Sequence, residues 1–362
     1  MWPLLLAALT LLTFMLPLLP AILEWRRRRD IRPLPIDGEH TLDVAAVAAG
    51  FRSMIERQDD LSFQRGMEHP VSSLRPVAHV TNTFEPTAAQ IATGVCAQTL
   101  VARGALSLPD GYTFARDIFG QVGICTGRKN RVQALLSDGV IVLREGSELN
   151  RWAHARSVRV EPQCQLLGPL CALHAVHIDD DCRFASVSAP VIRFGPAEPI
   201  RGGDNRTKGA AQPAPREASA TPLEPAEARD GRWLVTHDLR LPADSLYLGD
   251  LVVHGNLWLG TGTRIGGSVK ASGSIWLQAQ VRIDGALVAA DAITVGDTCS
   301  VAGPMAAERE IAVSAHSVIG TAAQPTTVVA PVLRVQVGAV IHGAVCALEE
   351  GRVVSTGVAP TD

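Results

Sequence analysis

Residues 265–271 read Ile-Gly-Gly-Ser-Val-Lys-Ala, and this pattern of apolar residues around a central glycine returns twice in the following sequence. Residues 283–289 and 301–307 repeat it, so the central glycines Gly267, Gly285 and Gly303 are evenly spaced. A fixed period built from short apolar alternations is typical of solenoids, in which successive turns of the chain, or rungs, stack on one another. The sequence therefore predicts an all-β solenoid whose rungs are of nearly constant length.

Glycine marks one corner of each predicted rung. The predicted corner glycines are Gly249, Gly267, Gly285, Gly303, Gly320 and Gly343. Gly320 comes one residue earlier than the regular interval, and the longer interval before Gly343 leaves room for a small insertion. We expect glycine at these corners because it adopts positive φ without a steric penalty. Between corners, alternate side chains such as Val269 and Ala271 are expected to face one shared core.

The composition agrees with thin, stacked rungs. The chain has 362 residues, of which 47% are hydrophobic and only 4% aromatic, so its core is expected to consist of small aliphatic side chains. The net charge of −3 argues against a nucleic-acid-binding protein, because such proteins usually carry a basic stripe. The 7 cysteines are an odd number spread along a long chain, which argues against a disulfide scaffold.

Residues 2–23 form a leucine-rich run without a charged side chain. About 20 apolar residues suffice for a helix to cross the hydrocarbon core of a membrane. Four basic residues follow the run, namely Arg26, Arg27, Arg28 and Arg29. Because positive residues stay on the cytoplasmic side, the sequence predicts a single-pass protein with its N-terminus outside and the rest of the chain in the cytoplasm. A cleaved signal peptide is the alternative, but its positive charges would precede the apolar run.

The rest of the chain divides by composition and pattern. Residues 41–58 carry apolar residues at helical spacing, whereas residues 202–230 are rich in Pro, Ala, Arg and Glu and lack large apolar side chains. The predicted divisions are a transmembrane helix (1–25), a juxtamembrane linker and helix (26–90), a degraded solenoid block (91–200), an insertion without a core of its own (201–231) and a regular solenoid block (232–354). The insertion is either a loop from one continuous solenoid or a linker between two stacks.

The first solenoid block follows the same pattern less regularly. Aligning Gly168 with Gly285 gives inward positions at Val158, Val160, Cys164, Leu166, Leu170 and Ala172. One rung earlier, the inward positions are Ile141, Leu143, Leu149, Ala153 and Ala155. Arg151 stands there in place of the corner glycine.

A stack of rungs has two ends, each with unpaired backbone groups and an apolar interior. Such an edge is a template for the addition of further strands unless a polar cap covers it. The segment after Ala347 is too short for a helical cap, so the last rung is predicted to be a self-association end. Its residues are Leu333, Val335, Ile341 and Val345.

Within the regular block, residues 249–347 resemble the bactofilins, the polymer-forming cytoskeletal proteins of bacteria. The resemblance lies in the repeated phrase of residues 280–295, Gln-Val-Arg-Ile-Asp-Gly-Ala-Leu-Val-Ala-Ala-Asp-Ala-Ile-Thr-Val. It implies a right-handed parallel β-helix that polymerises end to end without a nucleotide and is sometimes tethered to the inner membrane. It also implies a scaffold for envelope, cell-shape or polysaccharide machinery. The expected partners are further copies of the chain, the bacterial inner membrane, and envelope or cell-shape proteins.

Three enzymatic or metal-binding interpretations compete with the scaffold. A hexapeptide-repeat acyltransferase, with a left-handed β-helix, has the same period because three hexads make one rung, but here glycine seldom follows the aliphatic residue of each hexad and no loop carries a clear catalytic histidine. A polysaccharide-cleaving enzyme needs paired carboxylates, and Asp179-Asp180-Asp181 is expected to lie in a turn instead. Cys171, His174, His177 and Cys182 are residue types that bind metals, but the pattern places Cys171 on the outer face. We therefore predict no enzyme activity, no cofactor and no metal site.

Overall fold

The computed structural model describes residues 43–64, 77–196, 227–229 and 232–355 of the chain. The predicted transmembrane helix, Arg26, Arg27, Arg28 and Arg29, and nearly all of the predicted insertion lie outside these residues. Within the described ranges, no helix is both long enough and apolar enough to span a membrane.

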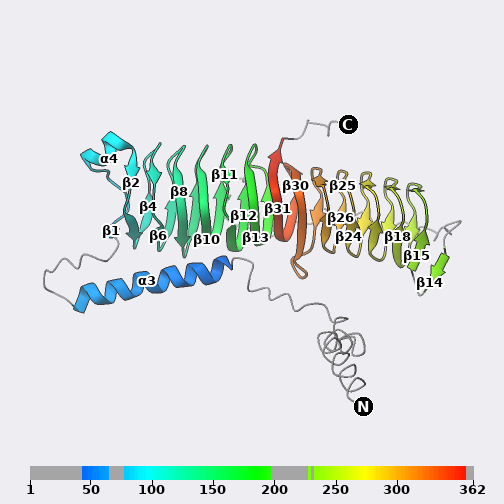
Figure 1. The fold of residues 1–362 in the computed structure, drawn as a ribbon, viewed down its shortest axis with the longest axis horizontal. Helices are drawn as coiled ribbons and strands as arrows, with labels where there is room; N and C mark the ends of the chain where they lie inside the picture. The colour runs from blue at the N-terminus through cyan, green and yellow to red at the C-terminus, as the bar shows by residue number, and fades with distance from the viewer. Residues whose placement is uncertain (1–42, 65–76, 197–226, 230–231, 356–362) are drawn as a thin grey trace, which may run out of the picture. The chain divides into compact units, whose positions relative to one another are not determined.

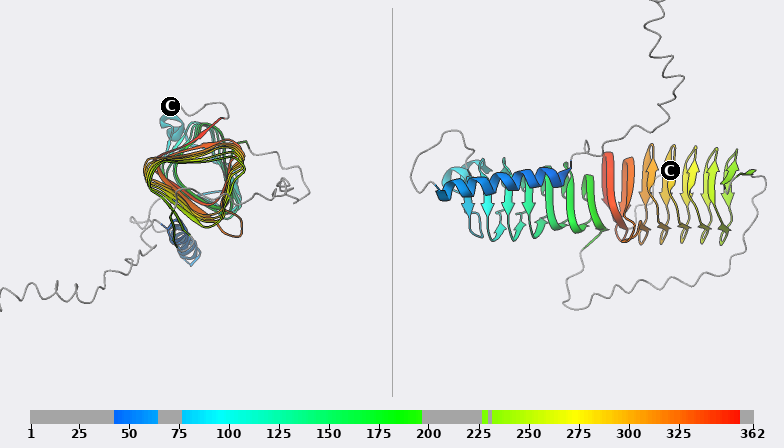
Figure 2. Two further views of the ribbon diagram at one scale, coloured as in Figure 1. Left: turned by 90° about the vertical axis from the view of Figure 1, so that its right-hand side faces the viewer. Right: turned by 90° about the horizontal axis from the view of Figure 1, so that it is seen from below.

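From Val77 onward the chain winds into a β-solenoid of about 14 turns. The end-on view shows a three-sided cross-section, and the side view shows the rungs stacked along one axis (Figures 1 and 2). Each rung contributes a strand to each of three faces. The predicted β-solenoid is therefore confirmed, and it is divided into a first block that ends at Phe194 and a second block that begins at Arg232.

The second block has long ladders of parallel strands. Its first face contains β15 (Arg232–Val235), β18 (Asp250–Val253), β21 (Val269–Ala271), β24 (Leu287–Ala289) and β27 (Met305–Ala307). Its second face contains β16 (Leu239–Leu241), β19 (Leu257–Leu259), β22 (Ile275–Leu277), β25 (Ala292–Val295) and β28 (Glu310–Val313). Its third face contains β17 (Leu246–Tyr247), β20 (Arg264–Ile265), β23 (Arg282–Ile283), β26 (Ser300–Val301) and β29 (Val318–Ile319). The last two strands, β30 (Thr326–Gln336) and β31 (Val340–Val354), bend round corners and serve more than one face.

The first block repeats this arrangement with longer strands. Strands β1 (Val77–Val80), β3 (Thr99–Ala102) and β6 (Ile118–Gly120) belong to its first face, and β4 (Ala105–Ser107), β7 (Gly123–Cys125) and β9 (Val140–Leu143) to its second. Strands β2 (Val95–Cys96), β5 (Thr113–Phe114) and β11 (Gln165–Leu166) belong to its third. The bent strands are β8 (Arg131–Ser137), β10 (Glu148–Val160), β12 (Leu170–Ile178) and β13 (Arg183–Phe194). Because β1 belongs to the stack, the solenoid begins earlier than the predicted boundary at residue 91.

The predicted register is present in both blocks. In the second block Leu251 pairs with Val269, which pairs with Leu287, and all three side chains are buried. Every inward residue that the alignment of the first block predicts is buried as well. One apolar cluster runs through both blocks without interruption. The inward alternation thus identified the core of the regular block and of the degraded one.

The glycines at the predicted corners are required by close approach of the backbone more than by φ. A Cβ atom on Gly285 would lie 2.6 Å from the carbonyl carbon of Gly267, and Gly303 has the same relation to Gly285 at 2.5 Å. Gly267, Gly285 and Gly303 do not have positive φ, so the reason expected from the sequence is wrong for these three. Gly249, Gly320 and Gly343 do have positive φ, as expected.

Gly320 lies outside this glycine stack. Thr326, the partner of Gly343, takes the stack position, and the extra residues 321–325 separate it from Gly320.

The left-handed corner of each rung lies elsewhere in the sequence. Residues with positive φ recur at the corner before the third face, at Asp244, Gly262, Gln280, Thr298, His316 and Gly338 in the second block. The first block has the same corner at Gly111, Lys129, Gly146, Gln163 and Asp181. Several of these residues are not glycine, so a search for glycine alone does not find the corner. Its recurrence in both blocks indicates that they share one backbone plan.

The two blocks meet end to end with their chain directions reversed. All pairings between rungs within each block are parallel, whereas β13 and β31, the last strands of the two blocks, pair antiparallel. Figure 1 shows these two strands side by side in the middle of the stack, with β1 toward one end and β15 toward the other. The chain between Phe194 and Arg232 therefore connects two stacks, and neither stack continues the other rung by rung.

Two helices accompany the first block. Helix α3 (Val44–Gln64) begins and ends later than the helix expected over residues 41–58, and it lies along the first face of that block (Figure 2). Its buried Phe51 contacts Trp152 with the ring centroids 6.0 Å apart, and Arg52 forms an ion pair with Asp138. Helix α4 (Ala88–Thr93) starts with a capping box between Thr87 and Gln90.

Candidate assembly surfaces

The predicted self-association end lies inside the column. Leu333, Val335, Ile341 and Val345 are all between 0% and 1% exposed. Val345 pairs with Val187 of the first block, and Ile341 pairs with Ile192. Leu333 and Val335 lie one rung further in, where they pair with Gly351 and Val353 of β31. The last rung, which contains Ile341 and Val345, is not a free end, because the first block covers it. We call this β13–β31 contact the junction.

The junction is held by main-chain pairing, by a close fit and by ion pairs at its rim. Arg352 donates a hydrogen bond to Asp181 at 2.8 Å, and this carboxylate raises the pKa of the guanidinium. Arg183 forms a second ion pair with Glu350 at 3.4 Å. A Cβ atom on Gly351 would lie 2.4 Å from the Phe184 ring, so only glycine fits here.

One feature of the junction was partly visible in the sequence, and another was not. The turn predicted at Asp179-Asp180-Asp181 is confirmed, but its part in the junction was not foreseen. Nothing in the repeat indicates that Gly351 faces Phe184, because the two residues belong to different blocks.

The first tip of the column is the outer side of β1 and β2. Phe84 fills the interior at this tip and contacts Phe114 edge to face, with the ring centroids 5.7 Å apart. The Gln90 side chain of α4 lies 3.7 Å from the Cys96 thiol, which is fully buried. Among the described residues, β1 pairs only with β3, and β2 only with β5. No described strand pairs with their other edges.

The second tip is the outer side of β15, β16 and β17. The short strand β14 (Glu227–Arg229) pairs antiparallel with β15 and covers that edge. Within the described part of the chain, β16 pairs only with β19, and β17 only with β20. Leu239 is partly buried against the core, and Leu248 is 65% exposed beside this tip. Among the described residues, this tip therefore combines two strand edges without a partner, those of β16 and β17, with one exposed apolar side chain, Leu248.

The candidate metal ligands do not meet. Cys171 packs on the outer face near α3, His174 is exposed, and Cys182 is fully buried inside the rung. The hydrogen bond with Cys164 and then burial raise the pKa of the Cys182 thiol, so it stays protonated. In the residues that the structure describes, no cluster of three or more His, Cys, Asp or Glu side chains is suited to a metal ion.

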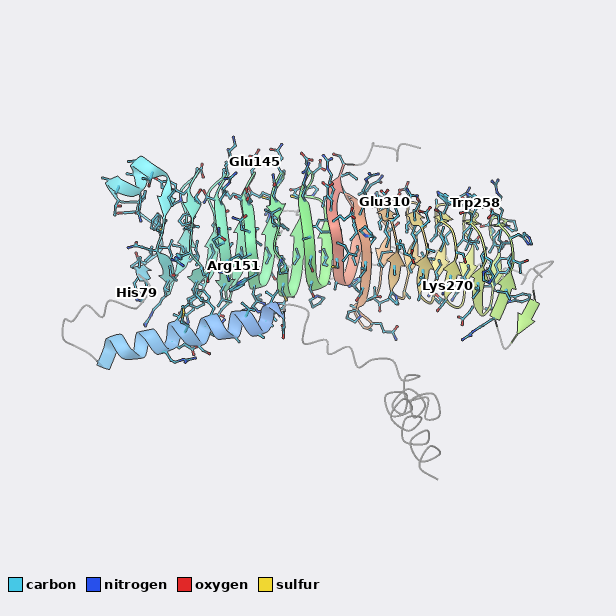
Figure 3. The ribbon with its side chains drawn as sticks, viewed as in Figure 1. His79, Glu145, Arg151, Trp258, Lys270 and Glu310 are labelled. Carbon is cyan, nitrogen blue, oxygen red and sulfur yellow. The ribbon has the colours of Figure 1, made fainter. Side chains whose placement is uncertain are left out.

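A row of aromatic rings on the second face was missed in the sequence. Arg240, Trp258 and Trp276 recur at the same interval as the central glycines, and register places them on successive rungs. The two indole rings stack with centroids 4.9 Å apart, and the Arg240 guanidinium lies 4.5 Å from the centroid of the Trp258 ring. Figure 3 shows Trp258 on the second block. The regular spacing of these large residues was the signal that could have revealed the row.

No protein-family model matches this chain, and the comparisons with curated proteins and with solved structures found no similar protein. The resemblance to bactofilins therefore stays an expectation drawn from the repeat in residues 249–347.

Proposed function

We propose that this chain is a non-catalytic, bactofilin-like scaffold that associates end to end with further copies through the two tips of its column. The junction is the observation that carries the proposal. Inside one chain, two solenoid ends already pair through the main chain and bury apolar side chains such as Val187 and Val345. The tips offer further strand edges of the same kind, and an open edge is a template for pairing with another chain.

Different elements cover the two tips of the column, and this difference determines which kinds of assembly are expected. The first tip carries α4 and Phe84, whereas the second carries the β14–β15 hairpin. If the first tip of one copy binds the second tip of the next, the contact is heterologous and gives an open filament. If each tip binds the same tip of another copy, every contact is a symmetric pair, and the two kinds of pair alternate along a fibre. In this proposal the helix is right-handed, in line with the strong preference of crossover connections between parallel strands.

The remaining parts of the proposal concern regions outside the described residues. The apolar run of residues 2–23 anchors the chain in the bacterial inner membrane, and Arg26, Arg27, Arg28 and Arg29 keep the rest of the chain in the cytoplasm. The anchored column then recruits envelope or cell-shape proteins along its sides.

Electron microscopy and sedimentation of the full chain in detergent test the proposal. We expect filaments, and a sedimentation coefficient that rises with protein concentration. Leu239→Arg, which places a charge at the second tip, is expected to shorten the filaments. Val288→Arg serves as the control, because Val288 is 36% exposed on a side face. A monomer at every concentration would contradict the proposal, and discrete trimers that bind acyl-coenzyme A would favour the acyltransferase.

A further inference from the structure

Arginines on the outer faces of this column usually have a carboxylate partner one rung away. Arg131 lies 3.1 Å from Glu148, and Arg334 lies 2.9 Å from Glu310. The strand pairs β8–β10 and β28–β30 bring these residues together. Since neighbouring strands lie about 4.8 Å apart, a carboxylate on the next rung is within reach of a guanidinium.

One row of basic side chains departs from this rule. On the second face of the first block, Arg159 of β10 pairs with His177 of β12, which pairs with Arg193 of β13. We call these three residues the Arg–His–Arg row. The residues that continue the row on either side are uncharged, because Arg159 also pairs with Val142 and Arg193 with Val340.

No carboxylate among the described residues forms an ion pair with the row. The acidic residues at the following corner, Glu161 and Asp179, have other partners. The Glu161 carboxylate accepts a hydrogen bond from the Glu145 backbone at 3.2 Å and lies 3.9 Å from Arg144. The Asp179 carboxylate accepts one from the Asp180 backbone at 2.8 Å.

The row lacks compensating negative charge. Arg159 and Arg193 are exposed, whereas His177 between them is half-buried. Burial lowers the pKa of the His177 imidazole, and Arg193 and Arg159 lower it further. Both guanidinium groups therefore lie close enough to His177 to interact with it electrostatically.

We propose that the Arg–His–Arg row is a binding site for a phosphate group. Guanidinium groups flank the site on both sides and donate hydrogen bonds in the planar geometry that matches phosphate oxygens. His177 lies in the middle and adds a third donor. Three donors from three successive rungs match the three acceptor oxygens of a phosphate monoester better than the two of a carboxylate.

The groups around His177 define how the site depends on pH. Arg159 and Arg193 face it from the neighbouring strands, and His174 and Asp179 lie on or just beyond its own strand. On β31 the nearest titratable side chain, His342, is hydrogen-bonded to the Pro190 carbonyl at 3.0 Å. A bound anion favours the protonated imidazole, so binding of an oxyanion of constant charge tightens as the pH falls through the titration of His177.

Calorimetric titration of the full chain in detergent with inorganic phosphate at low ionic strength tests the site. We expect saturable binding that Arg159→Gln and Arg193→Gln each weaken about tenfold or more. Arg131→Gln is the matched control, because Arg131 is an exposed arginine on another face that already has Glu148 as its partner. Circular dichroism checks that the variants remain folded.

Sulfate isolates the part that His177 plays, because its charge is constant between pH 5 and 8. The affinity for sulfate is expected to rise toward pH 5, and His177→Asn is expected to abolish this dependence. Absence of phosphate binding, equal binding of acetate, or an equal loss in Arg131→Gln would overturn the proposal.

The phosphate can belong to a soluble solute or to a lipid headgroup. The lipid headgroup would be identified if short-chain phosphatidic acid binds at least tenfold more tightly than inorganic phosphate and if Arg193→Gln removes this difference in affinity. Equal or weaker binding of the lipid would identify a soluble phosphate. The site is independent of self-association, so either result leaves the sedimentation of the chain unchanged.

Discussion

The two blocks of the column share an interior but differ in their regularity. In the second block the inward partners Leu251, Val269 and Leu287 follow one another at a constant interval. In the first block the interval from Leu100 to Ile118 is the same, but the next one, to Leu135, is one residue shorter. One core nevertheless runs through both. Stacking therefore depends on apolar residues at inward positions, and differences in rung length are accommodated at the corners.

The blocks also differ on their outer first faces. In the first block Phe119, Leu136 and Trp152 are buried beneath α3. In the second block the corresponding face carries Lys270 and Val288, both of which are exposed. The strands beneath α3 therefore carry apolar side chains on both their inward and their outward sides. The apolar outward side chains partly hide the alternation of apolar and polar residues from which the strands were predicted.

The strongest test of the comparison separates the blocks at the junction. Val345→Arg places an unpaired charge against Val187, where the side chain is fully buried. We expect the free energy of unfolding to fall by about 3–5 kcal/mol, since a buried charge without a partner is costly. Urea denaturation measures the change. Val288→Arg on the outer face is the control, and equal tolerance of both variants would mean that the blocks do not pack together.

A second test removes the helix contact that distinguishes the first block. Phe51→Ala deletes the buried ring that contacts Trp152, and we expect a loss of about 3 kcal/mol. Hydrogen exchange is expected to accelerate in β6 and β8 but not in β21 and β24. Val47→Ala is the matched variant, because Val47 is 37% exposed on the same helix and its truncation is expected to have little effect. Uniform acceleration in both blocks would contradict a contact confined to the first.

A third test concerns the glycine stack of the second block. Gly285→Ala brings a Cβ atom to 2.6 Å from the Gly267 backbone, and we expect a loss of about 1–3 kcal/mol in thermal denaturation. Gly50→Ala in α3 is the opposite case, because no atom lies within 4 Å of the added Cβ. That variant is expected to gain about 0.5–1 kcal/mol through helix propensity. A neutral Gly285→Ala would show that the rungs are not packed this closely.

The smallest expected effect is that of the ion pair between α3 and the first block. The hydrogen bond from Arg52 lowers the pKa of the Asp138 carboxyl in the folded protein. The pair therefore stabilises the protein at pH values above the pKa of Asp138 in the unfolded chain. This stabilisation is lost as the pH falls through the lower pKa of the folded state. Both side chains are more than one-third exposed, so Asp138→Asn is expected to cost at most about 1 kcal/mol at pH 7. Denaturation at pH 7 and at about pH 3 measures this difference, which should vanish in acid. A difference that persists at low pH would rule out the electrostatic cause.

The inward positions were predictable because they follow a local rule. The alternation that identified Val158, Leu166 and Ala172 operates within a few residues of the chain, and all three are buried. The left-handed corner was not predictable, because Gln163 and Thr298 adopt positive φ there although their residue types do not indicate it. A repeated backbone can impose a conformation that single residues do not prefer.

The candidate assembly surfaces were only partly predictable. The sequence correctly indicated that Ile341 and Val345 belong to the last rung, and it gave no sign that another strand covers them. Register within a block is determined by the spacing of residues, but contact between two blocks depends on how their ends fit, and residues far apart in the chain share no spacing rule. The Arg–His–Arg row was unpredictable for a similar reason, because its three residues become neighbours only when three strands are aligned in the folded protein.

By itself, the sequence determined that this chain stacks β-rungs around a core of small aliphatic side chains, because a side chain's inward or outward position follows from its place in a short strand. Only the tertiary structure decided that the two stacks meet through their last rungs and that a helix covers one of them. It also decided that, among the described residues, the strand edges without a partner lie at the starts of both blocks. These features depend on complementary surfaces brought together from distant parts of the chain, such as Phe184 against Gly351, and no local pattern records them.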